Sequence, residues 1–128
     1  NPFHRAGLTG KDQIVAVSDS GLDTQHCFFR DEDGEAGNIY GRWDFTRRKV
    51  VNYDWISGEG DHKDAYAGHG THVAGTVAGE VLVDGKVGDP DRYPSGVAPH
   101  ARLSFFDMRK ARRGMYNPGA DVLFDSVR

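Results

Sequence analysis

Two short segments combine residue types that can do chemistry with small neighbours that leave them accessible. In residues 15–22 an apolar run ends at Asp19. A carboxylate at the carboxyl end of a parallel strand lies where open α/β sheets place their sites. In residues 68–79 His69 stands between two glycines, which leaves its imidazole open to another side chain and to substrate. Asp19 and His69 are therefore the candidate catalytic residues.

Each candidate also has a purely structural interpretation. Asp19 can cap the turn that begins with Ser20, because Asp and Gly favour turns. His69 can be a structural histidine beside a close-packed helix. A metal site of His62, His69 and His72 is a further hypothesis, but zinc motifs on helices more often space their histidines at i, i+4 than at the i, i+3 seen here. We therefore expect no metal site.

The elements that must position these residues follow from the apolar pattern. Residues 13–18 predict a strand with apolar residues on both faces, which is typical of a buried parallel strand. From His69 to about Val83 apolar residues recur at helical spacing, and small residues favour close packing on the adjoining surface. The expected face consists of His69, Val73, Val77 and Val81.

A second strand over 101–106 and a helix from about Val122, capped by Asp121, complete the pattern. Alternation of strands and helices predicts an α/β layered sheet.

Composition limits the function classes. With 128 residues the chain is one domain or part of one, and a net charge of −3 does not favour nucleic-acid or membrane-surface binding. No apolar run reaches the length of a membrane span, and no signal peptide opens the chain, whose first residues resemble an internal start. The basic cluster at 109–113 is interpreted as a solvated loop. Cys27 has no partner for a disulfide within the chain, so the redox compartment stays open.

Residues 30–67 differ from their surroundings. They contain an acidic stretch, a basic stretch and short apolar pieces, which predict an ordered surface insertion with brief strands.

Three ordered segments together resemble the subtilase family, the subtilisin-like serine proteases of peptidase family S8. Residues 68–79 match the family's histidine motif, Asp19-Ser20-Gly21 its aspartate motif, and residues 96–103 the strand after the histidine helix. The order, aspartate before histidine, is that of subtilisin. The resemblance implies a three-layer α/β fold with a mostly parallel sheet. Residues 1–128 would be the N-terminal half of the catalytic domain.

The same resemblance implies a serine-type endopeptidase with an Asp-His-Ser triad. His69 would act as general base, Asp19 would orient it, and His72 would be structural. No serine of the chain stands in the Gly-Thr-Ser setting that the family uses, and no asparagine fits its oxyanion residue. We therefore expect these groups further along the parent protein and predict that this chain alone is inactive. The alternative is a non-catalytic subtilase-like binding or regulatory module.

The remaining expectations also come from the resemblance. The partners would be a polypeptide substrate and the rest of the catalytic domain, without nucleic acid or cofactor, and the parent protein would be secreted or in the secretory pathway or vacuole. Some relatives bind structural calcium through an aspartate where this chain has Phe28, so that site is not carried over. Departures from the family are Ser18, in place of an aliphatic residue, and the long separation of Asp19 from His69.

Overall fold

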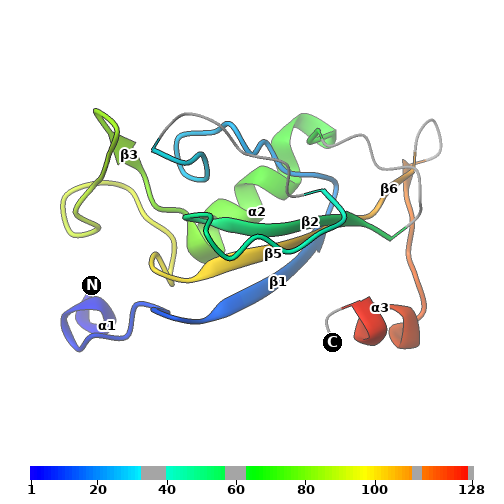
Figure 1. Cartoon of the computed structure of the whole chain (residues 1–128), viewed down its shortest axis with the longest axis horizontal. Coiled ribbons are helices and arrows are strands. Elements are labelled where there is room, and N and C mark those ends of the chain that lie inside the picture. The colour runs from blue at the N-terminus through cyan, green and yellow to red at the C-terminus, as the bar shows by residue number, and fades with distance from the viewer. Residues whose placement is uncertain (33–39, 57–62, 111–113, 127–128) are drawn as a thin grey trace.

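The computed structural model describes residues 1–32, 40–56, 63–110 and 114–126. The elements of the described chain, in order, are α1 (Pro2–Arg5), β1 (Ile14–Asp19), β2 (Val50–Trp55), the 3-10 turn η1 (Tyr66–Gly68), α2 (His69–Ala78), β3 (Leu82–Val83), β4 (Lys86–Val87), β5 (Arg102–Asp107), β6 (Arg109–Lys110), β7 (Gly114–Met115) and α3 (Ala120–Ser126). Figure 1 shows α2 lying along the main sheet, while α1 and α3 lie at opposite ends of an elongated molecule.

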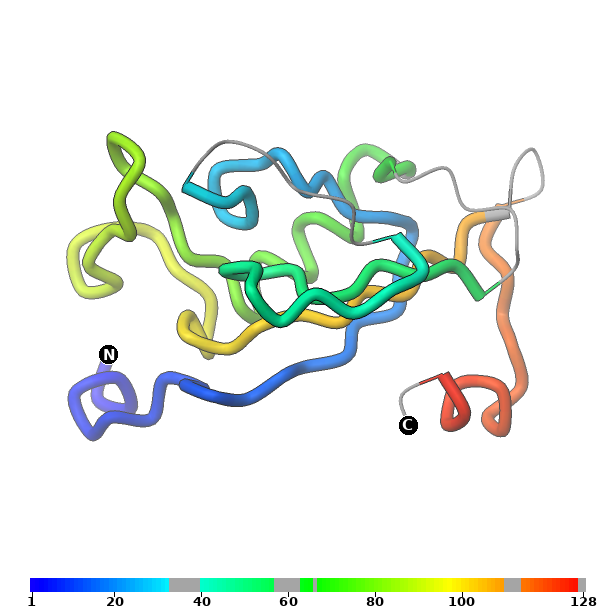
Figure 2. Tube along the Cα trace, viewed as in Figure 1, coloured from blue at the N-terminus to red at the C-terminus, as the bar shows by residue number. Residues whose placement is uncertain are grey.

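The main sheet contains three parallel strands in the order β1-β5-β2. Its central strand, β5, comes last in the sequence, so the chain returns between its two earlier strands, as the trace in Figure 2 shows. Asp19 at the end of β1 is in register with Asp107 at the end of β5. This arrangement confirms the predicted α/β class and places Asp19 at the carboxyl edge of a parallel sheet.

Helix α2 packs through its smallest residues. Its buried residues are Gly70, Ala74, Gly75 and Ala78. The close packing expected of the small-residue surface is therefore confirmed. On the adjoining face His69 is exposed, whereas Val73 and Val77 are half-buried and pack against the core. Alanine and glycine let the helix axis approach the sheet closely, which valines at those positions would prevent.

The helix is also shorter than predicted. It ends at Ala78 because Gly79 leaves helical geometry, with φ −60° and ψ 134°. Leu82 and Val83 then form β3, which pairs with β4 in a hairpin. The apolar spacing that suggested a longer helix therefore belongs partly to a strand.

Only one face of β1 is well buried. Val17 and Asp19 are buried on the side of α2, whereas Ile14 and Ala16 on the other side are exposed in the described part of the chain. The expectation of a strand covered on both faces was wrong for this chain. The alternating apolar residues predicted the strand correctly, and Ser18, on the open face, is half-buried.

The segment 30–67 contributes to the core as well as to the surface. Strand β2 lies within it, and its first four residues are all buried. This part is therefore a strand of the main sheet rather than a surface excursion. Residues 33–39 and 57–62 of the segment lie outside the described residues.

The C-terminal elements agree with the sequence pattern. Strand β5 confirms the strand predicted over 101–106, and α3 the helix expected near Val122, with Asp121 inside the first turn instead of at the cap. The predicted basic loop contains a hairpin of β6 and β7. Among the described helices, none has the length and apolar character that a membrane crossing needs.

Candidate active site

Asp19 and His69, fifty residues apart in sequence, meet at the carboxyl edge of the sheet. Nδ1 of His69 lies 2.8 Å from Oδ1 of Asp19. Asp19 is the last residue of β1 and His69 the first residue of α2. With its proton on Nδ1, the imidazole donates to the carboxylate, and Nε2 is left with a lone pair that can accept a proton.

The two partners differ sharply in exposure. The Asp19 side chain is 11% exposed and the His69 side chain 64%. A buried carboxylate that holds an accessible imidazole fixes one ring nitrogen and offers the other to a reacting group. This geometry suits a general base.

Burial of the Asp19 carboxylate would by itself raise its pKa. Hydrogen bonds from His69 and Ser20 outweigh that effect, so the pKa of Asp19 is lowered from its usual value. The Ser20 amide donates to Oδ1 of Asp19 at 2.7 Å. Asp19 is therefore held as the anion that a paired imidazole requires.

The pKa of His69 is raised. The hydrogen bond to Asp19 contributes most, followed by the Asp19 charge, and Asp64 adds a smaller electrostatic contribution. The imidazolium that forms when His69 accepts a proton is therefore stabilised by the carboxylates of Asp19 and Asp64.

Two consecutive left-handed residues precede His69. Ala67 has φ 58° and ψ 31°, and Gly68 has φ 86° and ψ 22°. Glycine adopts this conformation freely, whereas alanine is strained there by about 1 kcal/mol. Backbone strain of this kind concentrates at functional sites, and here it directs the chain into α2 at His69.

Glycines bring the two candidate segments into backbone contact. A Cβ added at Gly70 would overlap the carbonyl oxygen of Gly21 and would lie 3.2 Å from Cβ of Asp19. Sequence reasoning assigned Gly70 the task of exposing the imidazole. The structure shows that it also lets the start of α2 dock against the turn after Asp19.

Two further side chains complete this junction. They are Ser20, which the sequence placed only in the aspartate motif, and Asp64, which it did not single out. The Ser20 hydroxyl donates to Asp64 at 2.8 Å and accepts from the Gly70 amide at 3.1 Å. Asp64 also accepts from the Thr71 amide at 2.8 Å. An acidic residue shortly before a helix was the available signal for Asp64, because such residues favour helix starts.

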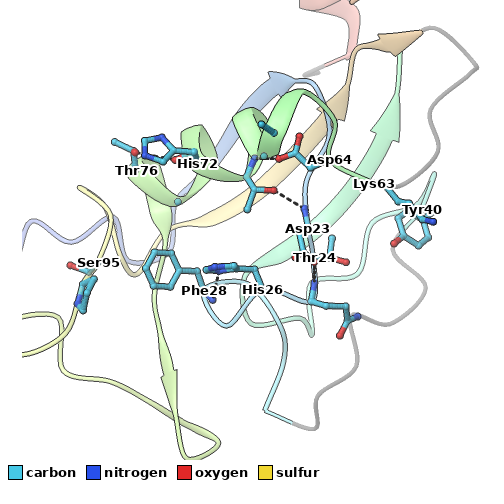
Figure 3. Close-up of a pocket in the computed structure, with 16 residues that line it drawn as sticks. Asp23, Thr24, His26, Phe28, Tyr40, Lys63, Asp64, His72, Thr76 and Ser95 are labelled. Atoms are coloured by element: carbon cyan, nitrogen blue, oxygen red, sulfur yellow. Dashed lines mark hydrogen bonds between the residues drawn. The ribbon is translucent and has the colours of Figure 1, made fainter. Parts of the chain in front are cut away.

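An open cavity of about 1020 Å³ adjoins the site (Figure 3). Its walls come from the turn at 23–28, the segment at 63–68 and one side of α2. Neither Asp19 nor His69 lines this cavity, but Gly68 and Thr71, which lie on either side of His69 in the sequence, do. His72, predicted to be structural, is an exposed residue of this wall.

The metal hypotheses gain no support. His62 lies outside the described residues, and His69 already bonds Asp19 through Nδ1. Within the described ranges no three His, Cys, Asp or Glu side chains form a group that could hold a metal ion. Phe28 packs edge-on against His26, with ring centroids 5.1 Å apart, and its ring offers no oxygen to calcium.

Comparison with known proteins identifies the family of this chain. The sequence profile of the subtilase family (Peptidase_S8) matches residues 10–120. The chain is 40% identical over 134 aligned residues to the Serine protease/ABC transporter B family protein tagD of Dictyostelium discoideum, covering 93% of this chain and 7% of that protein.

Two further relatives extend the comparison. The chain is 39% identical over 103 residues to the Serine protease/ABC transporter B family protein tagA of Dictyostelium discoideum, covering 80% of this chain and 5% of the relative. It is 37% identical over 97 residues to the Major intracellular serine protease of Bacillus subtilis (strain 168), covering 76% of this chain and 24% of the relative. The chain thus spans a small part of each relative's length. Because the family profile covers most of its residues, the chain belongs to the subtilase family.

Proposed function

We propose that this chain is part of a serine-type endopeptidase in which Asp19 and His69 are two members of an Asp-His-Ser triad. Membership of the subtilase family supports a serine protease as the parent protein. The observation that carries the residue assignment is the 2.8 Å hydrogen bond between a buried Asp19 carboxylate and an exposed His69 ring.

In the proposed reaction, Nε2 of His69 accepts the proton of a serine hydroxyl as that oxygen attacks the carbonyl carbon of a peptide bond. His69 then returns the proton to the leaving amine. Asp19 keeps the proton of the other ring nitrogen on Nδ1 and stabilises the imidazolium without accepting its proton. The substrate is a polypeptide, and these steps use no cofactor.

The nucleophile is proposed to come from a part of the parent protein outside residues 1–128. Ser20 and Ser104 are both buried, with side chains bonded to Asp64 and Asn52. Neither hydroxyl is available to attack a substrate. Loss of the triad serine costs about 10⁶ in kcat, a value known from subtilisin. This chain by itself is therefore proposed to be inactive.

A fluorophosphonate probe, which reacts with activated serines, tests the proposal. We expect labelling of the full-length protein, loss of labelling in His69→Ala, and none of the isolated chain. The matched control is His100→Ala, which alters an exposed histidine outside the site and should leave labelling unchanged.

The outcomes separate the alternatives. A folded full-length protein that takes up no probe would favour the non-catalytic module. Probe on the isolated chain that disappears in His69→Ala would place the nucleophile within residues 1–128 and overturn the proposed division of the triad.

A further inference from the structure

A short segment ahead of α2 is held against the turn that follows β1. The amide of Ala65 donates to the carbonyl oxygen of Ser20 at 3.3 Å. A Cβ added at Gly21 would overlap the carbonyl oxygen of Lys63 and would lie 2.9 Å from Cα of Asp64. The backbone of this segment therefore touches the turn directly, which places Asp64 between the two candidate catalytic segments.

The two carboxylate oxygens of Asp64 bond to different elements. Oδ1 accepts from the Ser20 hydroxyl at 2.8 Å, and Oδ2 accepts from the Thr71 amide at 2.8 Å, a bond drawn in Figure 3. Ser20 is the neighbour of Asp19, and Thr71 lies two residues after His69. Asp64 therefore connects the hydroxyl of the residue after Asp19 to the backbone amide two residues after His69.

The direction of these hydrogen bonds is fixed. An ionised carboxylate can only accept, so the Ser20 hydroxyl donates to Asp64 at 2.8 Å, with the Ala65 carbonyl oxygen as a more distant acceptor at 3.4 Å. Oγ of Ser20 in turn accepts from the Gly70 amide at 3.1 Å. Two free amides in the first turn of α2 thus find partners, and a negative charge lies at the positive end of the helix. The bridge therefore joins the turn after β1 to the first turn of α2.

We propose that Asp64 is a positioning residue of the protease site, which through Ser20 and the first turn of α2 sets the distance between Asp19 and His69. The inference rests on the proposed function. Asp64 touches neither the Asp19 carboxylate nor a reacting atom in this arrangement. Its effect is on the geometry of the pair and, through its charge, on the protonation of His69.

The electrostatic part has a definite sign. Asp64 raises the pKa of His69, in addition to the larger effects of Asp19. Removing the Asp64 charge should lower that pKa, so that neutral His69 persists to lower pH. Among the described side chains, the titratable groups on the segments that adjoin His69 are Asp19, Asp23, Lys63, Asp64 and His72.

The test measures the fluorophosphonate labelling rate of the full-length protein as a function of pH in Asp64→Asn, with Asp19→Asn in parallel. We expect a rate roughly ten- to a hundredfold lower at the plateau, from loss of positioning. The acid limb should move to lower pH, because the imidazolium of His69 loses the attraction of the Asp64 charge. A role in folding alone would lower the rate without moving that limb.

The matched control is Asp89→Asn, the same chemical change at an exposed aspartate that caps a turn away from the site. This variant should leave both the labelling rate and the position of the acid limb of its pH profile unchanged. Ser20→Ala keeps the Asp64 charge and removes the hydroxyl that lies between Asp64 and the Gly70 amide. Its labelling rate, measured well below its melting temperature so that the protein is fully folded, should fall without a shift of the limb, and an unchanged rate would contradict the positioning role. This milder variant decides the positioning role if Asp64→Asn fails to fold.

The outcomes are distinguishable. Wild-type behaviour of Asp64→Asn and Ser20→Ala, with Asp19→Asn inactive, would overturn this inference and leave the proposed function standing. An unlabelled wild-type protein, or a fully active Asp19→Asn, would overturn the proposed function and this inference with it.

Discussion

Two charged groupings in this chain have opposite designs. At the site, Asp19 is buried but His69 is largely exposed. In a second grouping, which we call the buried cation cluster and define as Arg48, Lys49 and Glu80, the Arg48 and Glu80 side chains are 12% and 8% exposed and Lys49 is 1% exposed. The two groupings differ in whether their polar atoms are bonded within the protein or remain accessible to another molecule.

In the buried cation cluster the donors bond to the protein itself. Lys49 donates to the carbonyl oxygens of Pro99 and Ala101 at 2.6 and 2.5 Å. Arg48 bonds the Glu80 carboxylate at 3.0 Å and also reaches backbone carbonyls at Phe28, Arg30 and Glu80. The cluster joins the start of β2 to the start of β5 and to the loops around α2.

The site leaves one nitrogen of an exposed ring facing solvent, whereas the cluster uses its charges to connect backbone segments. A grouping that keeps an accessible atom can do chemistry, whereas one whose side chains are buried and bonded to carbonyl and carboxylate oxygens stabilises the fold. Burial alone therefore does not identify a functional charge.

The largest expected effect comes from exchanging a carboxylate for an amide in each grouping. Asp19→Asn in the full-length protein should lower kcat by about 10⁴, because an amide favours the wrong imidazole tautomer, with little loss of stability. Glu80→Gln should do the reverse, keeping kcat while lowering the melting temperature. Kinetics and thermal melting of both variants check this, and equal kinetic losses would contradict the comparison.

The second prediction concerns Lys49. Lys49→Ala should destabilise the fold locally by about 2–4 kcal/mol, because two buried carbonyls lose their partner and a cavity replaces the long side chain. Hydrogen exchange of β5 and of the turn before it, followed by mass spectrometry on the full-length protein, measures the loss. Lys11→Ala, at an exposed lysine, is the control and should not change exchange there.

The smallest expected effect is a dependence of the folding stability on pH that arises from Lys49 in the buried cation cluster. Burial lowers the pKa of Lys49 to about 8, partly offset by attraction to Glu80. Its pKa in the unfolded chain is about 10.5. Since the folded state releases this proton first, stability should rise from about pH 8 towards pH 10, by about 1–2 kcal/mol at pH 9.5.

Burial raises the pKa of Tyr53, so its contribution to stability falls above pH 10 and limits that window. Hydrogen exchange corrected for the intrinsic rate at each pH measures the rise, and Lys49→Met should remove it. A stability that stays constant or falls between pH 8 and 10 in the unaltered protein would show that folding does not lower the pKa of Lys49.

Several features of the fold were predictable because they depend on local sequence. The strands β1 and β5 and the helix α3 follow from short apolar runs and capping residues. The close packing of α2 through its small residues was predictable too. The end of the helix at Ala78 was not, because the apolar spacing continues into β3. The burial of β1 on one face depends on which elements cover it, which no strand pattern specifies.

By itself the sequence determined the family and the identity of the candidate pair, because both depend on residue types at fixed spacing within two short segments. Their catalytic role stays a prediction. Only the tertiary structure decided that Asp64 and Ser20 connect the two segments and that Lys49 is buried on carbonyls of a distant turn. These contacts join residues 44 to 52 positions apart. Such pairs leave no periodic trace in a sequence, because it is the packing of the sheet and α2 that brings them within hydrogen-bond distance.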